Sequence, residues 1–143
     1  MSEFIVSLEQ HPSPAEIRWL SDRLSSFNYA KTGHTDGKTL ALFLKSRAGQ
    51  MAGGFYGWTW GGWLQIDFLF VREDLRGRGF GRWMMLAAEA EANNRACTNA
   101  VLDTFSFQAL GFYQKMGFQI FAQLENFPGN HIRYYLKKKL KPL

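Results

Sequence analysis

The sequence predicts one α/β (α+β) domain, in which helices flank a central mixed, twisted sheet. Apolar strand-like segments interleave with segments of helical periodicity along the chain, which is typical of such a sheet. Of the 143 residues, 46% are hydrophobic and 16% are aromatic, a composition that excludes a disordered chain. This length suits a single hydrophobic core, so we expect one domain spanning residues 1–143.

The first forty residues predict a strand, a helix and a loop. Apolar and polar residues alternate over Phe4–Leu8, which indicates a first strand. Ser13-Pro14-Ala15-Glu16 is a capping box with proline at the first helical position. The helix that follows carries an apolar stripe that we expect to pack on a sheet, formed by Ile17, Leu20, Leu24 and Phe27. Residues 28–38 are polar and contain two glycines, which favours a mobile loop.

Three strands follow. Thr39–Ser46 and Met51–Trp60 form a predicted hairpin whose turn is Arg47–Gln50. A second turn at Gly61-Gly62 leads into a central strand, Leu64–Val71, in which the polar side chains Gln65 and Asp67 share one face.

Strong helix formers dominate from Arg82 to about Ala96, so we expect a helix there. The rest of the chain predicts a buried strand, a helix ended by Gly117, and two closing strands separated by a loop at Glu125–His131. In order, these are Ala100–Phe105, Gln108–Met116, Phe118–Leu124 and Ile132–Lys138.

The turn Arg76-Gly77-Arg78-Gly79-Phe80-Gly81 separates the central strand from its helix. Glycines at a helix start leave the unpartnered first-turn amides open to a ligand, and the helix dipole adds positive charge there. With the charges of Arg76, Arg78 and Arg82, this turn suits a pyrophosphate. Arginine-glycine repeats also occur in flexible RNA-binding tails, so the turn alone leaves two interpretations open.

Spacing excludes two familiar phosphate loops. A dinucleotide fingerprint requires glycine five residues after Gly77, where Arg82 stands. A P-loop requires Gly-Lys followed by Ser or Thr, and the stretch Leu64–Ala96 contains no such tripeptide. Arg76-x-x-Gly79-x-Gly81 after a strand instead resembles the coenzyme A signature of the GNAT (GCN5-related) N-acetyltransferase superfamily. Phe112-Tyr113-Gln114-Lys115-Met116-Gly117-Phe118 resembles that family's second motif, and the resemblance spans roughly residues 63–140.

The resemblance implies the GNAT acyltransferase fold, with acetyl-CoA as co-substrate and no metal. In this family a backbone amide at a bulge of the central strand contacts the acetyl carbonyl, and Leu69 matches that position. Ser106 stands where the family has an asparagine that bonds the coenzyme, and a hydroxyl could replace it. The residues expected to bind the coenzyme are Leu69, Phe70, Val71, Arg76, Gly77, Arg78, Gly79, Phe80, Gly81, Arg82 and Ser106.

Acetyl transfer requires a neutral amine, a stabilised oxyanion and a proton for the departing thiolate. Tyr113 matches the family tyrosine that protonates the thiolate, although a helix tyrosine also packs in cores. Asp67 is the candidate base, and a structural pairing with an arginine is its alternative. His34, His131 and Glu125 lie in loops that could reach the acceptor, although loop histidines are more often simply exposed.

The acceptor pocket is less defined. Tyr56, Trp58 and Trp60 alternate along their strand, which indicates either packing against a helix or an aromatic wall for an acceptor amine. Asn28 and Asp36 are candidates to complete that pocket. The expected substrate-binding residues are therefore Asn28, Trp58 and Trp60.

The net charge of +5 favours anionic ligands such as the phosphates of coenzyme A. Four of the lysines cluster at Lys137–Lys141, which is typical of a solvated strand end, so binding to nucleic acid is not expected. The N-terminus lacks the pattern of a signal peptide and no apolar run reaches membrane-spanning length, so we expect a cytoplasmic protein without a membrane partner. A homodimer is plausible for this fold.

The single cysteine, Cys97, excludes an internal disulfide and lies apart from both motifs. We therefore expect direct transfer of acetyl from acetyl-CoA to a primary amine of a small molecule, within a ternary complex. The alternatives are a protein or peptide amine as the acceptor, or a non-catalytic module that binds coenzyme A or nucleic acid.

Overall fold

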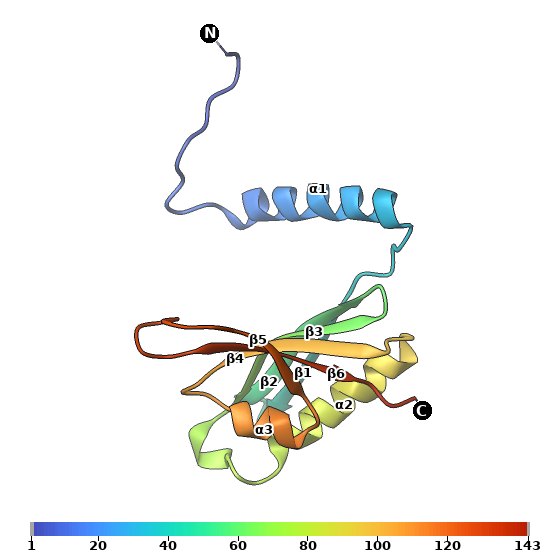
Figure 1. Cartoon of the computed structure of the whole chain (residues 1–143), viewed down its shortest axis with the longest axis vertical. Helices are drawn as coiled ribbons and strands as arrows, with labels where there is room; N and C mark the ends of the chain where they lie inside the picture. Colours follow the sequence, from blue (N-terminus) through green and yellow to red (C-terminus); the bar gives the residue numbers. More distant parts are fainter. Residues whose placement is uncertain (1, 143) are drawn as a thin grey trace. The chain divides into compact units, whose positions relative to one another are not determined.

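The structure is a computed structural model and describes residues 2–142. Its contacts divide the chain into two compact units, one ending at Thr35 and one beginning at Asp36 (Figure 1). Each unit is described by itself.

The first unit contains one helix, α1 (Pro14–Thr32). The predicted capping box is confirmed: Glu16 N donates to Ser13 Oγ at 3.1 Å, and Ser13 N donates to Glu16 Oε1 at 3.0 Å. The helix ends at Gly33, whose φ of +74° lets its N–H bond the carbonyl oxygen of Tyr29.

The predicted strand at Phe4–Leu8 is wrong, because residues 4–8 form no ladder. Alternation of apolar residues does not make a strand without a neighbour that accepts its backbone hydrogen bonds, and these side chains are exposed. No residue of α1 is buried, and its apolar stripe is more than half exposed. Since residues 2–35 contain no sheet, packing of this stripe on a sheet stays a prediction.

The second unit is built on a six-stranded mixed sheet with the order β1-β2-β3-β4-β6-β5. This sheet confirms the predicted fold class. Neighbouring strands are antiparallel except β3 and β4, which are parallel. The strands are β1 (Lys38–Lys45), β2 (Met51–Trp60), β3 (Trp63–Val71), β4 (Asn99–Phe105), β5 (Gln119–Leu124) and β6 (Arg133–Lys139). The helices are the short 3-10 turn η1 (Glu73–Leu75), α2 (Phe80–Asn94) and α3 (Leu110–Lys115).

Both predicted turns are confirmed. Ser46 N bonds the carbonyl oxygen of Gln50 at 2.9 Å and closes the β1–β2 hairpin around Gly49. Gly61 and Gly62 join β2 to β3 with φ of +57° and +86°, values that side chains disfavour. The predicted helix at Gln108–Met116 begins later, at Leu110, because Gln108 first closes a turn by donating its backbone N–H to the carbonyl oxygen of Phe105.

The core lies between α2 and the sheet. Met85, Ala88 and Ala92 of α2 are fully buried, as are Leu64 of β3 and Ala100 of β4. Burial of apolar surface on this scale is the main stabilising contribution to a unit of this size. It also places the start of α2 at the ends of the parallel strands. Among the described residues, no helix is long and apolar enough to cross a membrane.

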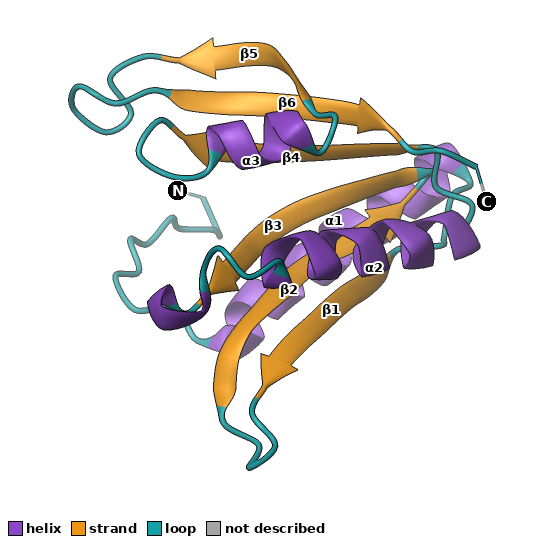
Figure 2. Cartoon of the chain, turned by 90° about the horizontal axis from the view of Figure 1, so that it is seen from below, coloured by secondary structure: helices purple, strands orange, loops and turns teal. Residues whose placement is uncertain are grey.

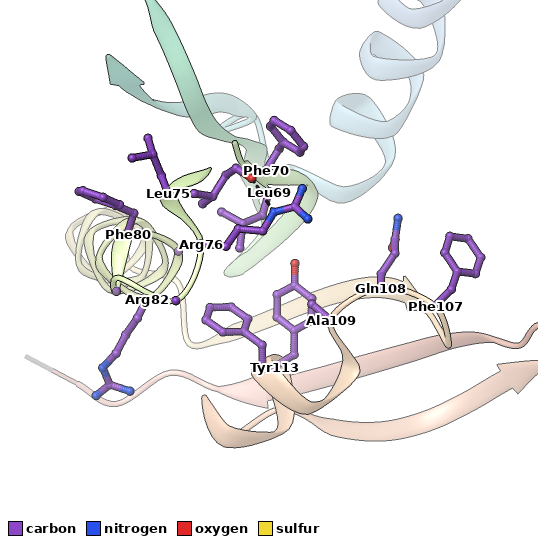
Figure 3. Close-up of a pocket in the computed structure, with 15 residues that line it drawn as sticks. Leu69, Phe70, Leu75, Arg76, Phe80, Arg82, Phe107, Gln108, Ala109 and Tyr113 are labelled. Carbon is purple, nitrogen blue, oxygen red and sulfur yellow. Dashed lines mark hydrogen bonds between the residues drawn. The ribbon is translucent and has the colours of Figure 1, made fainter. Parts of the chain in front are cut away.

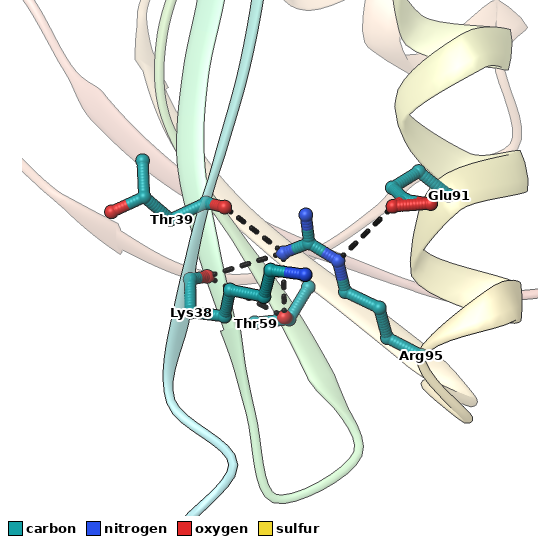
Figure 4. Close-up of polar contacts among 5 residues, drawn as sticks. All are labelled: Lys38, Thr39, Thr59, Glu91 and Arg95. Atoms are coloured by element: carbon teal, nitrogen blue, oxygen red, sulfur yellow. Dashed lines mark hydrogen bonds and ion pairs between the residues drawn. The ribbon is translucent and has the colours of Figure 1, made fainter.

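Arg95 fastens the end of α2 to the first two strands (Figure 4). Its Nη1 donates to the carbonyl oxygens of Lys38 and Thr39 at 3.3 and 3.1 Å and contacts Thr59 Oγ1 at 3.1 Å. Its Nε pairs with Glu91 at 3.3 Å. One side chain thereby donates hydrogen bonds to three oxygen atoms of β1 and β2.

The sheet opens in the middle, where β3 and β4 diverge (Figure 2). They pair only from Trp63–Ile66 to Asn99–Leu102, and β3 continues to Val71 without β4 beside it. The register of β2 on β3 shifts at the same place: Gly57 pairs with Ile66 and Tyr56 with Phe68, so Asp67 is an extra residue on β3. A bulge of this kind bends a strand, and it begins where β3 leaves β4.

Candidate active site

A cleft of about 660 Å³ lies between the diverging halves of the sheet (Figure 3). Its walls come from the end of β3, the turn into α2, and the segment from β4 into α3. The lining residues are Leu69, Phe70, Val71, Leu75, Arg76, Gly77, Gly79, Phe80, Gly81, Arg82, Phe107, Gln108, Ala109, Phe112 and Tyr113.

The start of α2 forms one end of the cleft. Gly79 caps the helix with φ of +87°, and the first intrahelical bond runs from Trp83 N to the carbonyl oxygen of Gly79 at 2.9 Å. The amides of Phe80, Gly81 and Arg82 therefore have no partner within the helix. A Cβ at Gly77 or Gly79 would meet no atom within 4 Å, so both positions leave open space for a ligand. Exposed amides at a helix N-terminus favour an anion.

The three arginines of the turn have different surroundings. Arg76 Nε donates to the carbonyl oxygen of Val71 at 2.8 Å, and its guanidinium lies 5.5 Å from the ring of Phe70. Arg82 Nη1 contacts Met116 Sδ at 3.7 Å, and its side chain points away from Tyr113 (Figure 3). Arg78 lies over Phe80 and is not part of the cleft lining.

Tyr113 lies on the opposite wall, on α3. Its ring packs edge-on against Phe112 and Phe118, with centroids 5.2 and 6.1 Å away, and 8% of the residue is exposed. Its hydroxyl points from α3 toward the end of β3 (Figure 3). Burial, with a smaller contribution from the negative charge of Asp103, raises the pKa of Tyr113 to about 12. The phenol is therefore protonated at neutral pH and can donate a hydrogen bond into the cleft.

Ser106 lies outside the cleft lining. Its Oγ accepts a hydrogen bond from Ile132 N at 3.0 Å and lies 3.4 Å from His131 Nδ1, so it ties the β4–α3 segment to the loop before β6. Gln108, which sequence reasoning did not select, does line the cleft. Its position two residues after Ser106, in the same turn, was the available signal.

Of the other candidate residues, Asp67, Trp58 and Trp60 belong to the second unit and are outside the cleft lining. Asp67 is the extra residue of the bulge, where its Oδ1 accepts a bond from Gln65 Nε2 at 3.4 Å. Trp58 and Trp60 are on β2, and neither lines the cleft. Asn28 belongs to α1 in the first unit, where its carbonyl oxygen accepts a bond from Thr32 Oγ1 at 2.8 Å. Within residues 2–142 no group of three acidic, histidine or cysteine side chains is placed to hold a metal ion.

Two aromatic side chains of β2, Tyr56 and Trp58, are partly exposed. Tyr56 and Trp58 are 42% and 39% exposed, whereas Phe55 and Thr59, which point to the opposite face, are buried. The ring of Tyr56 stacks on that of Phe68, with centroids 6.0 Å apart. Tyr56 and Trp58 therefore do not pack in the core beneath α2.

Diverging parallel strands, a helix start with unpartnered amides and a buried tyrosine in one cleft match the fold of an acyltransferase. The model of the acetyltransferase (GNAT) family matches residues 3–118. The chain belongs to this family and is an acetyltransferase.

Individual relatives agree with this assignment. An acetyltransferase of Agrobacterium fabrum is 32% identical over 120 residues, covering 84% of this chain and 88% of its own length. The blasticidin-S acetyltransferase of Streptomyces morookaense is 34% identical over 101 residues, covering 70% of this chain and 74% of its own. A crystal structure of a protein from Agrobacterium tumefaciens, assigned as an acetyltransferase, superposes with a TM-score of 0.87 at 29% identity, covering 95% of this chain and 99% of its own.

Proposed function

We propose that this protein transfers the acetyl group of acetyl-CoA to a primary amine of a small molecule, directly and within a ternary complex. The main support is that one cleft contains both the start of α2, with its unpartnered amides, and the hydroxyl of Tyr113. A coenzyme whose diphosphate lies at the helix start would extend its thioester arm along this cleft toward that hydroxyl.

In the proposed reaction the neutral amine attacks the thioester carbonyl carbon, and a C–N bond forms while the C–S bond breaks. The backbone N–H of Leu69, at the cleft end of β3, is the proposed donor to the carbonyl oxygen as negative charge develops. Tyr113 donates its phenolic proton to the departing sulfur, and the proton that the amine loses is returned to the resulting tyrosinate, so that no net proton is gained or lost. The products are the amide and the free thiol of coenzyme A.

The burial of Cys97 supports direct transfer rather than transfer through an acetyl-cysteine. Cys97 is buried, and burial raises the pKa of its thiol, which disfavours the nucleophilic thiolate. It also lies outside the cleft lining. An acetyl-cysteine intermediate therefore receives no support.

A small molecule is the favoured acceptor because a relative of 34% identity is named for acetylating blasticidin S. Asp67 remains the proposed base, with Trp58, Trp60 and Asn28 as proposed acceptor contacts. A peptide or protein amine is the alternative within the same chemistry. A homodimer and a cytoplasmic location stay predictions.

Calorimetric titration with acetyl-CoA tests the coenzyme site, with Gly79→Asp and Gly79→Asn as a matched pair. Both residues have similar size, and both visit the left-handed conformation of Gly79 more readily than other side chains. They differ in charge at the proposed diphosphate site. We expect the wild type to bind, Gly79→Asn to bind more weakly, and Gly79→Asp to lose binding.

Failure of the wild type to bind acetyl-CoA would overturn the proposal. Equal binding by the two variants would show that the diphosphate lies elsewhere. If binding is confirmed, a panel of small amines and peptides, followed by release of free thiol, identifies the acceptor class.

A further inference from the structure

We infer that Gln108 binds a carbonyl oxygen of the thioester arm of acetyl-CoA through its side-chain amide N–H. This inference rests on the proposed function and adds a binding residue to that site. The supporting observation is that Gln108 lines the cleft and that hydrogen bonds to its side-chain oxygen orient its carboxamide.

The oxygen of the Gln108 carboxamide is occupied within the protein. Oε1 accepts a hydrogen bond from the backbone N–H of Phe105 at 3.3 Å and another from Thr104 Oγ1 at 3.2 Å. A backbone N–H can only donate, so the atom that faces Phe105 must be the oxygen and not the amide nitrogen. The position of the oxygen thereby determines where the nitrogen lies.

The amide nitrogen lies at the outer end of the side chain and points away from α3 (Figure 3). The residue lines the cleft, and among the described residues no hydrogen bond from its Nε2 is found. The side chain of Gln108 is exposed, but its oxygen is held at two points. One of them, Thr104, is 2% exposed, and the backbone N–H of Gln108 itself bonds the carbonyl oxygen of Phe105 at 2.9 Å. An oriented donor held in this way loses little conformational entropy on binding a ligand.

The other polar side chains of the lining identify the ligand group. Arg76 and Arg82 are cations and suit phosphate, and Tyr113 is the donor proposed for the sulfur. The remaining lining side chains are apolar or glycine. A neutral N–H donor against apolar walls suits a neutral carbonyl oxygen, and the arm of acetyl-CoA offers two amide carbonyls and the thioester carbonyl.

Ser106 is placed less well for this contact than Gln108. Its Oγ accepts from Ile132 N and lies beside His131, outside the cleft lining.

The decisive variant is Gln108→Glu, because a carboxylate keeps the oxygen that accepts from Phe105 and Thr104 but removes the N–H donor. Gln108→Met keeps the length and removes both functions. Ser106→Ala is the control for the alternative position. Binding of acetyl-CoA, of S-acetylpantetheine and of adenosine 3′,5′-bisphosphate would be measured for each protein. The second probe lacks the phosphates, so repulsion between the new carboxylate and the diphosphate does not affect it.

We expect both Gln108 variants to weaken acetyl-CoA and S-acetylpantetheine about tenfold, as is typical for loss of one hydrogen bond in a cleft. Binding of adenosine 3′,5′-bisphosphate should stay unchanged, which also shows that the variants are folded. Ser106→Ala should leave the arm contact intact.

Unchanged S-acetylpantetheine binding in Gln108→Glu and Gln108→Met would overturn the inference while the coenzyme site stands. The same holds if Ser106→Ala shows the loss instead, or if Gln108→Glu weakens only ligands that carry phosphate. Failure of the wild type to bind acetyl-CoA would overturn the proposed function, and this inference with it.

Discussion

The Nε of Arg76 donates to the carbonyl oxygen of Val71 at 2.8 Å and so ties the glycine-arginine turn to the last residue of β3. The ring of Phe70 lies 5.5 Å from the same guanidinium. The arginine thus combines two tasks: it holds the turn against the strand, and it keeps a positive charge in the cleft lining.

Arg76→Lys should separate these two tasks, because lysine keeps the charge but lacks the fixed planar fork that reaches Val71 while facing the cleft. We expect the KM for acetyl-CoA to rise about tenfold with a smaller change in kcat, measured by thiol release once an acceptor is known. Arg78→Lys is the control, since Arg78 is outside the cleft lining. Equal effects of both changes would contradict this assignment.

Tyr113→Phe should lower kcat by about a hundredfold and leave the Kd for acetyl-CoA nearly unchanged, because general-acid contributions start at about that size. The ring keeps its packing against Phe112 and Phe118. Since the pKa of Tyr113 is about 12, this phenol should cause no loss of rate up to about pH 10. A variant with wild-type kcat would exclude Tyr113 as the proton donor.

The same raised pKa predicts an effect on stability at high pH. The folded value of about 12 exceeds the unfolded value of about 10, so the contribution is complete below pH 10 and is lost as pH rises toward 12. The two-unit difference corresponds to roughly 2–3 kcal/mol. The free energy of unfolding of the wild type should therefore fall more steeply between pH 10 and pH 12 than that of Tyr113→Phe, because the variant lacks this titration. Identical alkaline profiles would contradict the buried environment of the phenol.

Arg95→Ala should destabilise the second unit by about 2–3 kcal/mol, measured by urea unfolding. The loss follows because the Arg95 side chain donates to two backbone carbonyls and contacts the buried Thr59. Glu91→Gln is the control and should cost less than about 1 kcal/mol, since Glu91 is 41% exposed and contributes one weak ion pair. A larger effect at Glu91 would reverse this ranking.

Lys138 and Glu89 form a nearly buried ion pair at 2.6 Å between β6 and α2. Lys138→Met should destabilise the protein by about 3–5 kcal/mol, because it leaves the carboxylate of Glu89 buried and its Oε2 already lacks a hydrogen-bond partner. The double variant Lys138→Met/Glu89→Leu should recover much of this loss, as apolar replacements of buried pairs often do. No recovery in the double variant would show that the pair has a net stabilising role.

Local patterns predicted most elements of this chain. The capping box at Ser13, the turns at Gly49 and Gly61-Gly62, and the helix after Gly81 all depend on residues close in sequence, and all are confirmed. The strand at Phe4–Leu8 was wrong because a strand requires a neighbour that local alternation does not reveal. Most of the expected coenzyme residues line one cleft, whereas Arg78 and Ser106 do not.

The sequence by itself determined the glycine-arginine turn and the helix start that follows it, because glycine conformations and arginine charge are properties of six consecutive residues. It also determined the tyrosine motif that leads to the family. Only the tertiary structure decided that β3 and β4 part after Ile66, that Ser106 is occupied by the loop before β6, and that Gln108 faces the cleft instead. Those outcomes depend on strand pairing and hydrogen bonds between residues far apart in the chain, which spacing along a sequence does not encode.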